Sequence, residues 1–418
     1  MRRARTPAQR RFPRAAALLA LAVLLHSHGA NAAPPAAAAG GPCRPAAASY
    51  RIAMPGHPFA VLPSADEQHA FVSVQASNPR TRTGIAVLAC RDGRFVPVQF
   101  VPLESQPSGM ALTHDGKLLI AADDEYVVFV DTARAIAGRP AIAGYFRNLE
   151  DDDAGAVYAN VTPDDRFAFV SDENNATITV IDLAKARANG FTRASIVGAI
   201  PVGNAPIALT FTADARFLLT TSQRPRRSEN VPPACKPEGA DPATAAVTVP
   251  PGQIVVIDVQ KAQTDPAHAV TARIPAGCSP VRMSLAPDGA TAWVTARNSN
   301  AVLGFSVPKL VAGDAGAQIV SLPAGAAPVP VLATADGTMV LAGNSNRFGL
   351  GAKGDQTLSV FDAREAANGR SAALGQLAVG RFPRELTRTA SGSLIFLSNW
   401  DSDDVMVFDA ARLRQLVH

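Results

Sequence analysis

The chain has 418 residues, a formal net charge of +4 and an apolar content of 47%. Six arginines and no acidic residue lie in the first fourteen positions, so the formal net charge falls to −2 once residues 1–32 are removed. This balance argues against nucleic-acid binding through net charge. An aromatic content of 6% argues against a base-stacking platform.

The N-terminal segment has the pattern of an export signal. Residues 1–14 are basic, residues 15–25 form a short apolar run, and residues 30–32 (Ala-Asn-Ala) fit a small-x-small cleavage site. We therefore predict a signal peptide over residues 1–32, a disordered leader over residues 33–47, and a periplasmic or secreted protein. The apolar run is shorter than the roughly 20 residues that span a bilayer, so we expect no membrane anchor in the mature chain. The alternative is an uncleaved anchor.

From residue 48 onward one phrase recurs seven times: a leading proline, and a turn residue eight positions later. The leading residues are Pro58, Pro107, Ala156 (in place of proline), Pro206, Pro280, Pro328 and Pro383. The turn residues are Asp66, Asp115, Asp164, Asp214, Asp288, Asp336 and Ser391. A fixed offset at a long, regular recurrence indicates one supersecondary unit that is stacked many times.

Each repeat contains four segments with the composition of strands. In the second copy, residues 109–113, 117–121 and 126–130 are apolar or β-branched and are separated by Asp/Gly turns. A fourth strand is expected between copies, as at residues 270–274 and 318–322. The prediction is an all-β fold over residues 48–418, a seven-bladed β-propeller of four-stranded antiparallel blades. The blades are expected to start near residues 57, 106, 155, 205, 279, 327 and 382.

The last repeat lacks its fourth strand before the chain ends. Residues 50–58 match the fourth strand and leading proline of another copy, residues 272–280. We therefore predict that an N-terminal strand completes the last blade and closes the ring, which leaves no open sheet edge.

Four cysteines remain in the mature chain: Cys43, Cys90, Cys235 and Cys278. An even count in an exported protein indicates disulfides, and three pairings are possible. We favour Cys43–Cys90 and Cys235–Cys278, because each pair joins adjacent segments of the repeat; the alternative is free buried thiols. No spacing fits zinc or c-type haem, and the acidic runs at residues 150–153 and 401–404 are interpreted as solvated turns, so no metal or cofactor is expected.

The repeat phrases carry a family resemblance. Thr212-Ala213-Asp214, residues 286–289 (Ala-Pro-Asp-Gly) and residues 255–258 (Val-Val-Ile-Asp) resemble the S/T-P-D-G and V-I-D signatures of YVTN repeats. The chain is similar to YncE-like secreted β-propellers over nearly all of its mature length. This resemblance implies a binding propeller in the cell envelope or outside the cell.

The copies disagree two residues after the leading proline, near the mouth of the channel. The residues at this position are Ala60, Gly109, Tyr158, Ala208, Arg282, Pro330 and Glu385. Tyr158, Arg282 and Glu385 are large and polar where the others are small, and Arg384 and His57 lie nearby in sequence. We interpret them as ligand-binding candidates; the alternative is an ion pair between blades with a packed tyrosine.

Three connections between second and third strands are overlong: residues 75–83, 223–252 and 344–356. Loops on one face of a rigid ring are where propellers bind, although insertions there are also tolerated without a role. Arg347 in the third insertion and Trp400 in a turn complete the ligand-binding candidates.

The leading hypothesis is a non-catalytic, monomeric binding propeller for an unidentified peptide, glycan or small polar ligand. No hydrolase elbow or phosphate-binding loop is present in the sequence. The alternative is a lactonase-like hydrolase, because propellers of related repeat type include lactone-opening enzymes. In that case Arg282 would stabilise an oxyanion, and Glu385 or His57 would activate water. A haem or quinone electron-transfer propeller ranks last.

Overall fold

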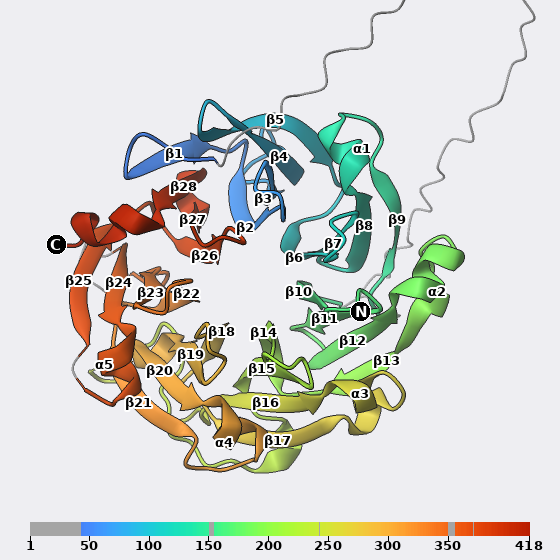
Figure 1. Cartoon of the computed structure of the whole chain (residues 1–418). Helices are drawn as coiled ribbons and strands as arrows, with labels where there is room; N and C mark the ends of the chain where they lie inside the picture. Colours follow the sequence, from blue (N-terminus) through green and yellow to red (C-terminus); the bar gives the residue numbers. More distant parts are fainter. Residues whose placement is uncertain (1–42, 150–153, 242, 350–355, 371) are drawn as a thin grey trace, which may run out of the picture. The chain divides into compact units, whose positions relative to one another are not determined.

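The computed structural model describes residues 43–149, 154–241, 243–349, 356–370 and 372–418. Their strands form seven four-stranded antiparallel sheets, arranged as blades around a central axis (Figure 1). The predicted seven-bladed β-propeller is therefore confirmed. The predicted signal peptide lies outside the described residues. Within the described ranges, no helix is long and apolar enough to cross a membrane.

The strands of each blade follow one another from the axis outward. Blade one contains β2 (His57–Pro63), β3 (His69–Gln75), β4 (Gly84–Arg91) and β5 (Arg94–Pro102), and blade two contains β6 (Pro107–Leu112), β7 (Leu118–Asp123), β8 (Tyr126–Asp131) and β9 (Ile142–Arg147). Blade three contains β10 (Ala156–Val161), β11 (Phe167–Asp172), β12 (Thr177–Asp182) and β13 (Ile196–Pro201), and blade four contains β14 (Asn204–Phe211), β15 (Phe217–Arg224), β16 (Gln253–Asp258) and β17 (Val270–Pro275). Blade five contains β18 (Pro280–Leu285), β19 (Thr291–Ala296), β20 (Ala301–Ser306) and β21 (Gln318–Pro323), and blade six contains β22 (Pro328–Ala333), β23 (Met339–Asn344), β24 (Thr357–Asp362) and β25 (Ala373–Ala378). Blade seven contains β26 (Pro383–Arg388), β27 (Leu394–Asn399), β28 (Asp404–Asp409) and β1 (Ser49–Ala53).

The fixed offset of eight residues has a local cause in the turn that ends each innermost strand. In blade three the Thr162 hydroxyl donates to Asp164 at 2.6 Å, and the Asp164 carboxylate accepts the Arg166 N–H at 3.1 Å. The next residue, Asp165, has a φ of +55°, and in every blade the residue at this position is left-handed, which favours Gly, Asp and Asn. We call the side of the ring where these turns lie the turn face. The opposite side, where the innermost strands begin, is the loop face.

The ring is closed by its N-terminal strand. β1 pairs antiparallel with β28, with Tyr50 opposite Val407, and Figure 1 shows the blue strand β1 beside the red strand β28. The Tyr50 hydroxyl accepts the buried N–H of Phe95 in blade one at 2.9 Å. Disulfides Cys43–Cys90 and Cys235–Cys278 are both present, as predicted. The first holds residues 43–47, which the sequence assigned to the leader, against blade one.

Short helices that the sequence reading did not predict follow the third strands. In α1 the carboxylate of Asp131 accepts the N–H of Arg134 at 2.8 Å, so the aspartate that ends the strand also caps the helix. The α-helices are α1 (Thr132–Ile136), α2 (Leu183–Ala188), α3 (Val259–Ala262), α4 (Val307–Val311) and α5 (Ala363–Ala367). The 3₁₀-helices are η1 (Arg193–Ser195), η2 (Arg227–Glu229), η3 (Pro266–His268), η4 (Arg297–Ser299), η5 (Trp400–Ser402) and η6 (Ala410–Leu416).

The core lies mainly between neighbouring blades. Trp293 of β19 is 1% exposed and belongs to one apolar cluster with Val331 and Val340 of blade six, as expected for a core residue. Close to the axis, Phe59, Val157, Ile207, Val281 and Val329, each one residue after its leading position, belong to another cluster. We call these five residues the apolar ring.

Candidate functional site

Three of the candidates meet at the axis. The Tyr158 hydroxyl donates to Oε1 of Glu385 at 2.9 Å, and Nη2 of Arg282 lies 2.9 Å from Oε2 of the same carboxylate. The Arg282 guanidinium also stacks over the Tyr158 ring, with its carbon 4.4 Å from the ring centre. These residues come from blades three, five and seven, and we call them the axial triad. The Arg282–Glu385 contact is the ion pair between blades that the sequence left open as an alternative.

The backbone of the triad is held by hydroxyl groups on the second strands. The Glu385 N–H donates to Ser398 Oγ at 3.1 Å, and that hydroxyl donates to the Phe59 carbonyl of the next blade at 2.7 Å. In blade five the Arg282 N–H donates to the Thr295 hydroxyl at 3.1 Å, and that hydroxyl donates to the Val329 carbonyl of blade six at 2.7 Å. A register shift follows each leading residue, so the residue at the triad position lies in an irregular part of the ladder that is fixed by these side chains.

Burial sets the electrostatics of the triad. The side chains of Arg282 and Glu385 are 6% and 8% exposed. Burial raises the pKa of Glu385, and the Arg282 charge partly offsets this effect. Burial also raises the pKa of Tyr158 above its usual range, and the Glu385 charge adds to the shift. Among the described residues, Nε and Nη1 of Arg282 have no hydrogen-bond partner, an unusual state for buried polar atoms.

The triad lies at the inner end of a cavity of about 550 Å³. Every residue that lines this cavity is at the triad position or later, in an innermost strand or in the turn that follows it, so the cavity extends from the triad toward the turn face. Its wall combines apolar side chains, such as those of Leu209 and Leu386, with polar ones. Asn160, Thr387 and Arg388 add polar groups. We call it the axial cavity.

The other four candidates lie on the loop-face side of the triad. Arg384 follows the leading proline of blade seven, and its guanidinium carbon lies 4.3 Å from the centre of the Phe59 ring. Arg347 stacks 5.6 Å from the centre of the Phe382 ring. None of these four residues lines the axial cavity.

His57 and Trp400 contact each other rather than the triad. Their rings stack with centres 3.9 Å apart, and Nδ1 of His57 lies 2.8 Å from a carboxylate oxygen of Asp403. The Trp400 indole N–H donates to Gln75 at 3.1 Å. The ring of His57 is engaged by the turn between β27 and β28, so of the two residues that the hydrolase hypothesis offered to activate water, Glu385 is the one beside Arg282.

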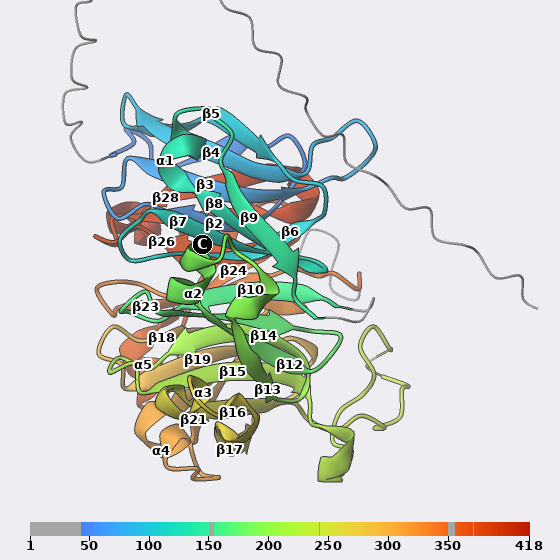
Figure 2. The ribbon, with the colours of Figure 1, turned by 90° about the vertical axis from the view of Figure 1, so that its right-hand side faces the viewer.

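The blade-four insertion is anchored across blade five. Besides the Cys235–Cys278 disulfide, Arg297 donates through Nε to Glu238 at 2.8 Å and through Nη2 to Gln223 at 2.8 Å. Figure 2 shows the yellow-green insertion on one side of the ring, while α1 and α5 lie on the other. Arg297 is 5% exposed and was missed by the sequence reading, because nothing in its repeat distinguishes it from a surface arginine.

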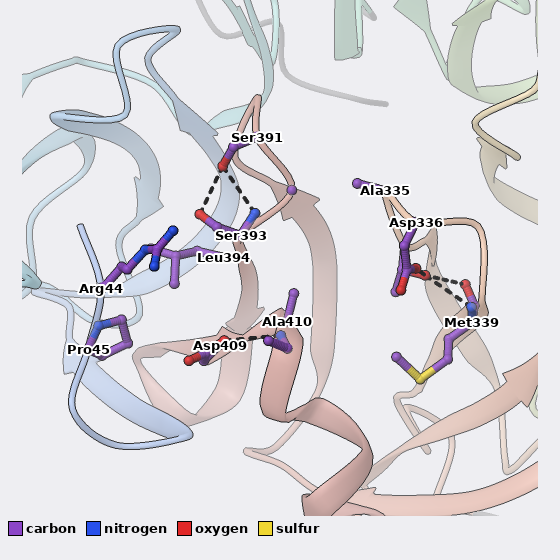
Figure 3. A pocket seen from close by; sticks show the side chains of 13 residues that line it. Arg44, Pro45, Ala335, Asp336, Met339, Ser391, Ser393, Leu394, Asp409 and Ala410 are labelled. Atoms are coloured by element: carbon purple, nitrogen blue, oxygen red, sulfur yellow. Dashed lines mark hydrogen bonds between the residues drawn. The ribbon is translucent and has the colours of Figure 1, made fainter. Parts of the chain in front are cut away.

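A second cavity, of about 360 Å³, lies between blades six and seven on the turn face (Figure 3). Its acidic groups serve local turns: Asp336 accepts the Thr334 hydroxyl at 2.5 Å, and Asp409 accepts the Ala411 N–H at 3.0 Å. No group of metal-binding side chains occurs within the described residues. The acidic run at residues 150–153 lies outside them, and Asp403 and Asp404 of the second run pair with His57 and Arg51.

One family model matches part of the chain. Residues 238–414 match the family model described as a lactonase with a seven-bladed β-propeller. The match includes Arg282 and Glu385 but not Tyr158. No curated protein matches the chain. Among solved structures, the chain is similar to one titled Kuenenia stuttgartiensis Hydrazine Synthase, with a TM-score of 0.62 and 16% identity over 86% of this chain and 96% of that chain. At this identity the likeness shows the fold alone.

Proposed function

We propose that this protein is exported and binds a small polar molecule in the axial cavity, with the axial triad at the inner end. One observation carries the proposal: the three polar residues that break the repeat at one position meet at the end of a cavity of ligand size. Small-molecule sites are typically concave, with a volume of about 300–1,000 Å³ and a few placed polar groups that orient the ligand.

The polar groups of the cavity wall favour a ligand with hydroxyl and carboxylate groups. Arg388 donates to the Ala333 carbonyl at 2.5 Å, and burial lowers its pKa, so a bound anion would stabilise its charged form. Among the described residues, Oγ1 of Thr387 is buried without a hydrogen-bond partner. A hydroxycarboxylate would supply an acceptor for Arg388 and a partner for Thr387.

Two features support an exported location. Both disulfides are formed between the cysteines of the mature chain, which is typical of proteins in oxidising compartments. The basic and apolar N-terminal segment has the pattern of a signal peptide. Together they favour the periplasm or the extracellular space.

A lactone hydrolase is a second candidate, and the family match over residues 238–414 favours it. In that role Arg282 would stabilise the oxyanion that forms as the lactone carbonyl is attacked. Glu385, whose pKa is raised by burial, would accept a proton from the attacking water. The product of such a reaction is a hydroxycarboxylate, the same class of molecule that the cavity wall favours.

A thermal-shift experiment with a cavity-filling variant tests the binding proposal. Ala208 lines the axial cavity at the triad position, so Ala208→Leu should fill part of it. Ala335→Leu is the matched control, because Ala335 is an exposed residue of the second cavity. We expect gluconate, malate or homoserine to raise the Tm of the native protein and of Ala335→Leu but not of Ala208→Leu. Shifts that persist in Ala208→Leu, or the absence of any shift, would contradict the proposal.

Turnover separates the two candidate functions. Hydrolysis of γ-butyrolactone and glucono-δ-lactone is followed in a pH-stat with the native protein, Glu385→Gln and Arg282→Gln. Turnover that is lost in both variants while they remain folded supports the hydrolase. Ligand binding without turnover supports a binding protein.

A further inference from the structure

Two arginines on the loop-face side of the triad, Arg347 and Arg384, form no ion pair with any residue that the structure describes. The guanidinium carbons of Arg384 and Arg347 lie 5.3 Å and 5.6 Å from the centre of the Phe382 ring. Among the described residues, neither guanidinium makes a hydrogen bond or an ion pair, and Nε of Arg384 is buried. The neighbouring Arg297, by contrast, is held by Glu238 and Gln223.

The positive charges gathered around Arg384 repel one another when no anion is bound. Burial lowers the pKa of Arg384 to about 9, and repulsion from Arg282, Arg347 and Arg297 adds to the effect. Burial and the charge of Arg297 likewise lower the pKa of Arg347. Glu173 attracts both arginines, but it forms no ion pair with either within the described residues. Glu385 pairs with Arg282, and Glu238 pairs with Arg297. Neither carboxylate forms an ion pair with Arg347 or Arg384 among the described residues.

Aromatic rings position these guanidinium groups without using their N–H donors. Arg384 lies over Phe59 as well as Phe382, and Arg347 also lies 5.3 Å from the centre of the Phe348 ring. Trp400 packs edge-on against Phe382 with ring centres 5.6 Å apart, which supports the ring shared by both arginines. Cation–π stacking of this kind holds an arginine while its donors remain available to a planar or tetrahedral anion.

The fold does not require a charged residue at position 384. Arg384 is one residue after the leading proline of its blade, and the equivalent residues are Phe59, Ser108, Val157, Ile207, Val281 and Val329. Five of them form the apolar ring. A valine would therefore satisfy the packing in blade seven, and the arginine needs a different explanation.

We propose that Arg347 and Arg384 form a binding site for the carboxylate or phosphate group of a small molecule on the loop face. Two guanidinium groups that share one aromatic ring present several N–H donors, and arginine binds both kinds of oxyanion through paired hydrogen bonds. The site is separate from the axial cavity, whose lining residues all lie on the turn-face side. The proposed anion site does not depend on ligand binding in the axial cavity.

Isothermal titration calorimetry with inorganic phosphate and with succinate tests this site in the full chain. Measurements at an ionic strength of about 10 mM keep screening weak. We expect at least one of the two anions to bind, and Arg384→Gln and Arg347→Gln each to weaken its binding at least about tenfold. Arg227→Gln is the matched control, because it removes one exposed positive charge from the blade-four insertion, and its effect should stay below about twofold. Phosphate binding alone indicates a phosphorylated ligand, and succinate binding alone indicates a carboxylate.

Three results would contradict the proposed anion site. If neither anion binds, or if Arg227→Gln weakens binding as much as Arg384→Gln, the attraction is absent or diffuse and the site does not exist. Without anion, Arg384→Gln should melt at the same temperature as the native protein or higher, because the substitution removes repulsion. A lower Tm would show that Arg384 serves packing, and would overturn the proposal. Ala208→Leu should leave anion binding unchanged, so the result does not depend on the axial cavity.

Discussion

Glu385→Gln should destabilise the protein by about 3–5 kcal/mol, which is the usual effect of removing one partner from a buried ion pair. The substitution preserves the shape of the side chain and its hydrogen bond from Tyr158. It removes the negative charge 2.9 Å from Nη2 of Arg282, whose side chain is only 6% exposed. Because Nε and Nη1 of Arg282 already have no hydrogen-bond partner among the described residues, the remaining guanidinium would be a buried, uncompensated charge.

A double-mutant cycle isolates this effect. Arg282→Met with Glu385→Gln removes both charges, so the double variant should be less destabilised than the sum of the two single variants by at least about 2 kcal/mol. The free energies come from urea unfolding with the disulfides intact. Unfolding is followed by the fluorescence of Trp293, which is 1% exposed. If Glu385→Gln costs less than about 1 kcal/mol and the cycle is additive within about 0.5 kcal/mol, the ion pair does not stabilise the axis and this reasoning fails.

Three further predictions concern other parts of the chain. Tyr50→Phe leaves the buried N–H of Phe95 without its acceptor, so urea unfolding should show a loss of about 1–3 kcal/mol, and an unchanged midpoint would argue against that hydrogen bond. Burial, with a smaller contribution from Asp124, raises the pKa of Asp123 to about 7, so the folded state binds this proton more tightly than the unfolded state. The contribution of Asp123 to stability should therefore be largest below pH 4, and should fall by up to about 4 kcal/mol as the pH rises to 7 and above. Melting curves from pH 4 to 8 should show this dependence in the native protein and not in Asp123→Asn. Replacing Cys235 and Cys278 together by serine should lower the Tm and speed proteolysis within the blade-four insertion, and cleavage no faster than in the native protein would show that the other contacts suffice to hold it.

The repeat could be predicted from the sequence because its signal is local. The eight-residue offset reflects a turn in which Thr162 donates to Asp164 and a left-handed residue follows, and these contacts depend only on neighbouring residues. The same alignment exposed Tyr158, Arg282 and Glu385, since equivalent residues of different blades lie at equal depth along the axis. Their meeting in one triad follows from that symmetry.

Features that depend on single contacts between blades could not be predicted. His57 is close in sequence to the triad position of blade one, but its ring is held by Trp400 and Asp403 from the last blade. Arg388 is the last residue of β26, where the repeat pattern gives no sign of a functional role. Its place in the axial cavity is seen only in the structure. The helices after the third strands were missed because a strand-ending aspartate looks the same whether a turn or a capped helix follows.

Crystals soaked with gluconate, malate and homoserine test the central claim most directly, because difference density shows where a small polar molecule binds. The axial-cavity proposal predicts density within hydrogen-bonding distance of Thr387 or Arg388 and in contact with the Tyr158–Arg282–Glu385 triad, and predicts that Ala208→Leu crystals lack it. Density confined to other surfaces, or an axial cavity that stays free of every compound in the native protein, would contradict it.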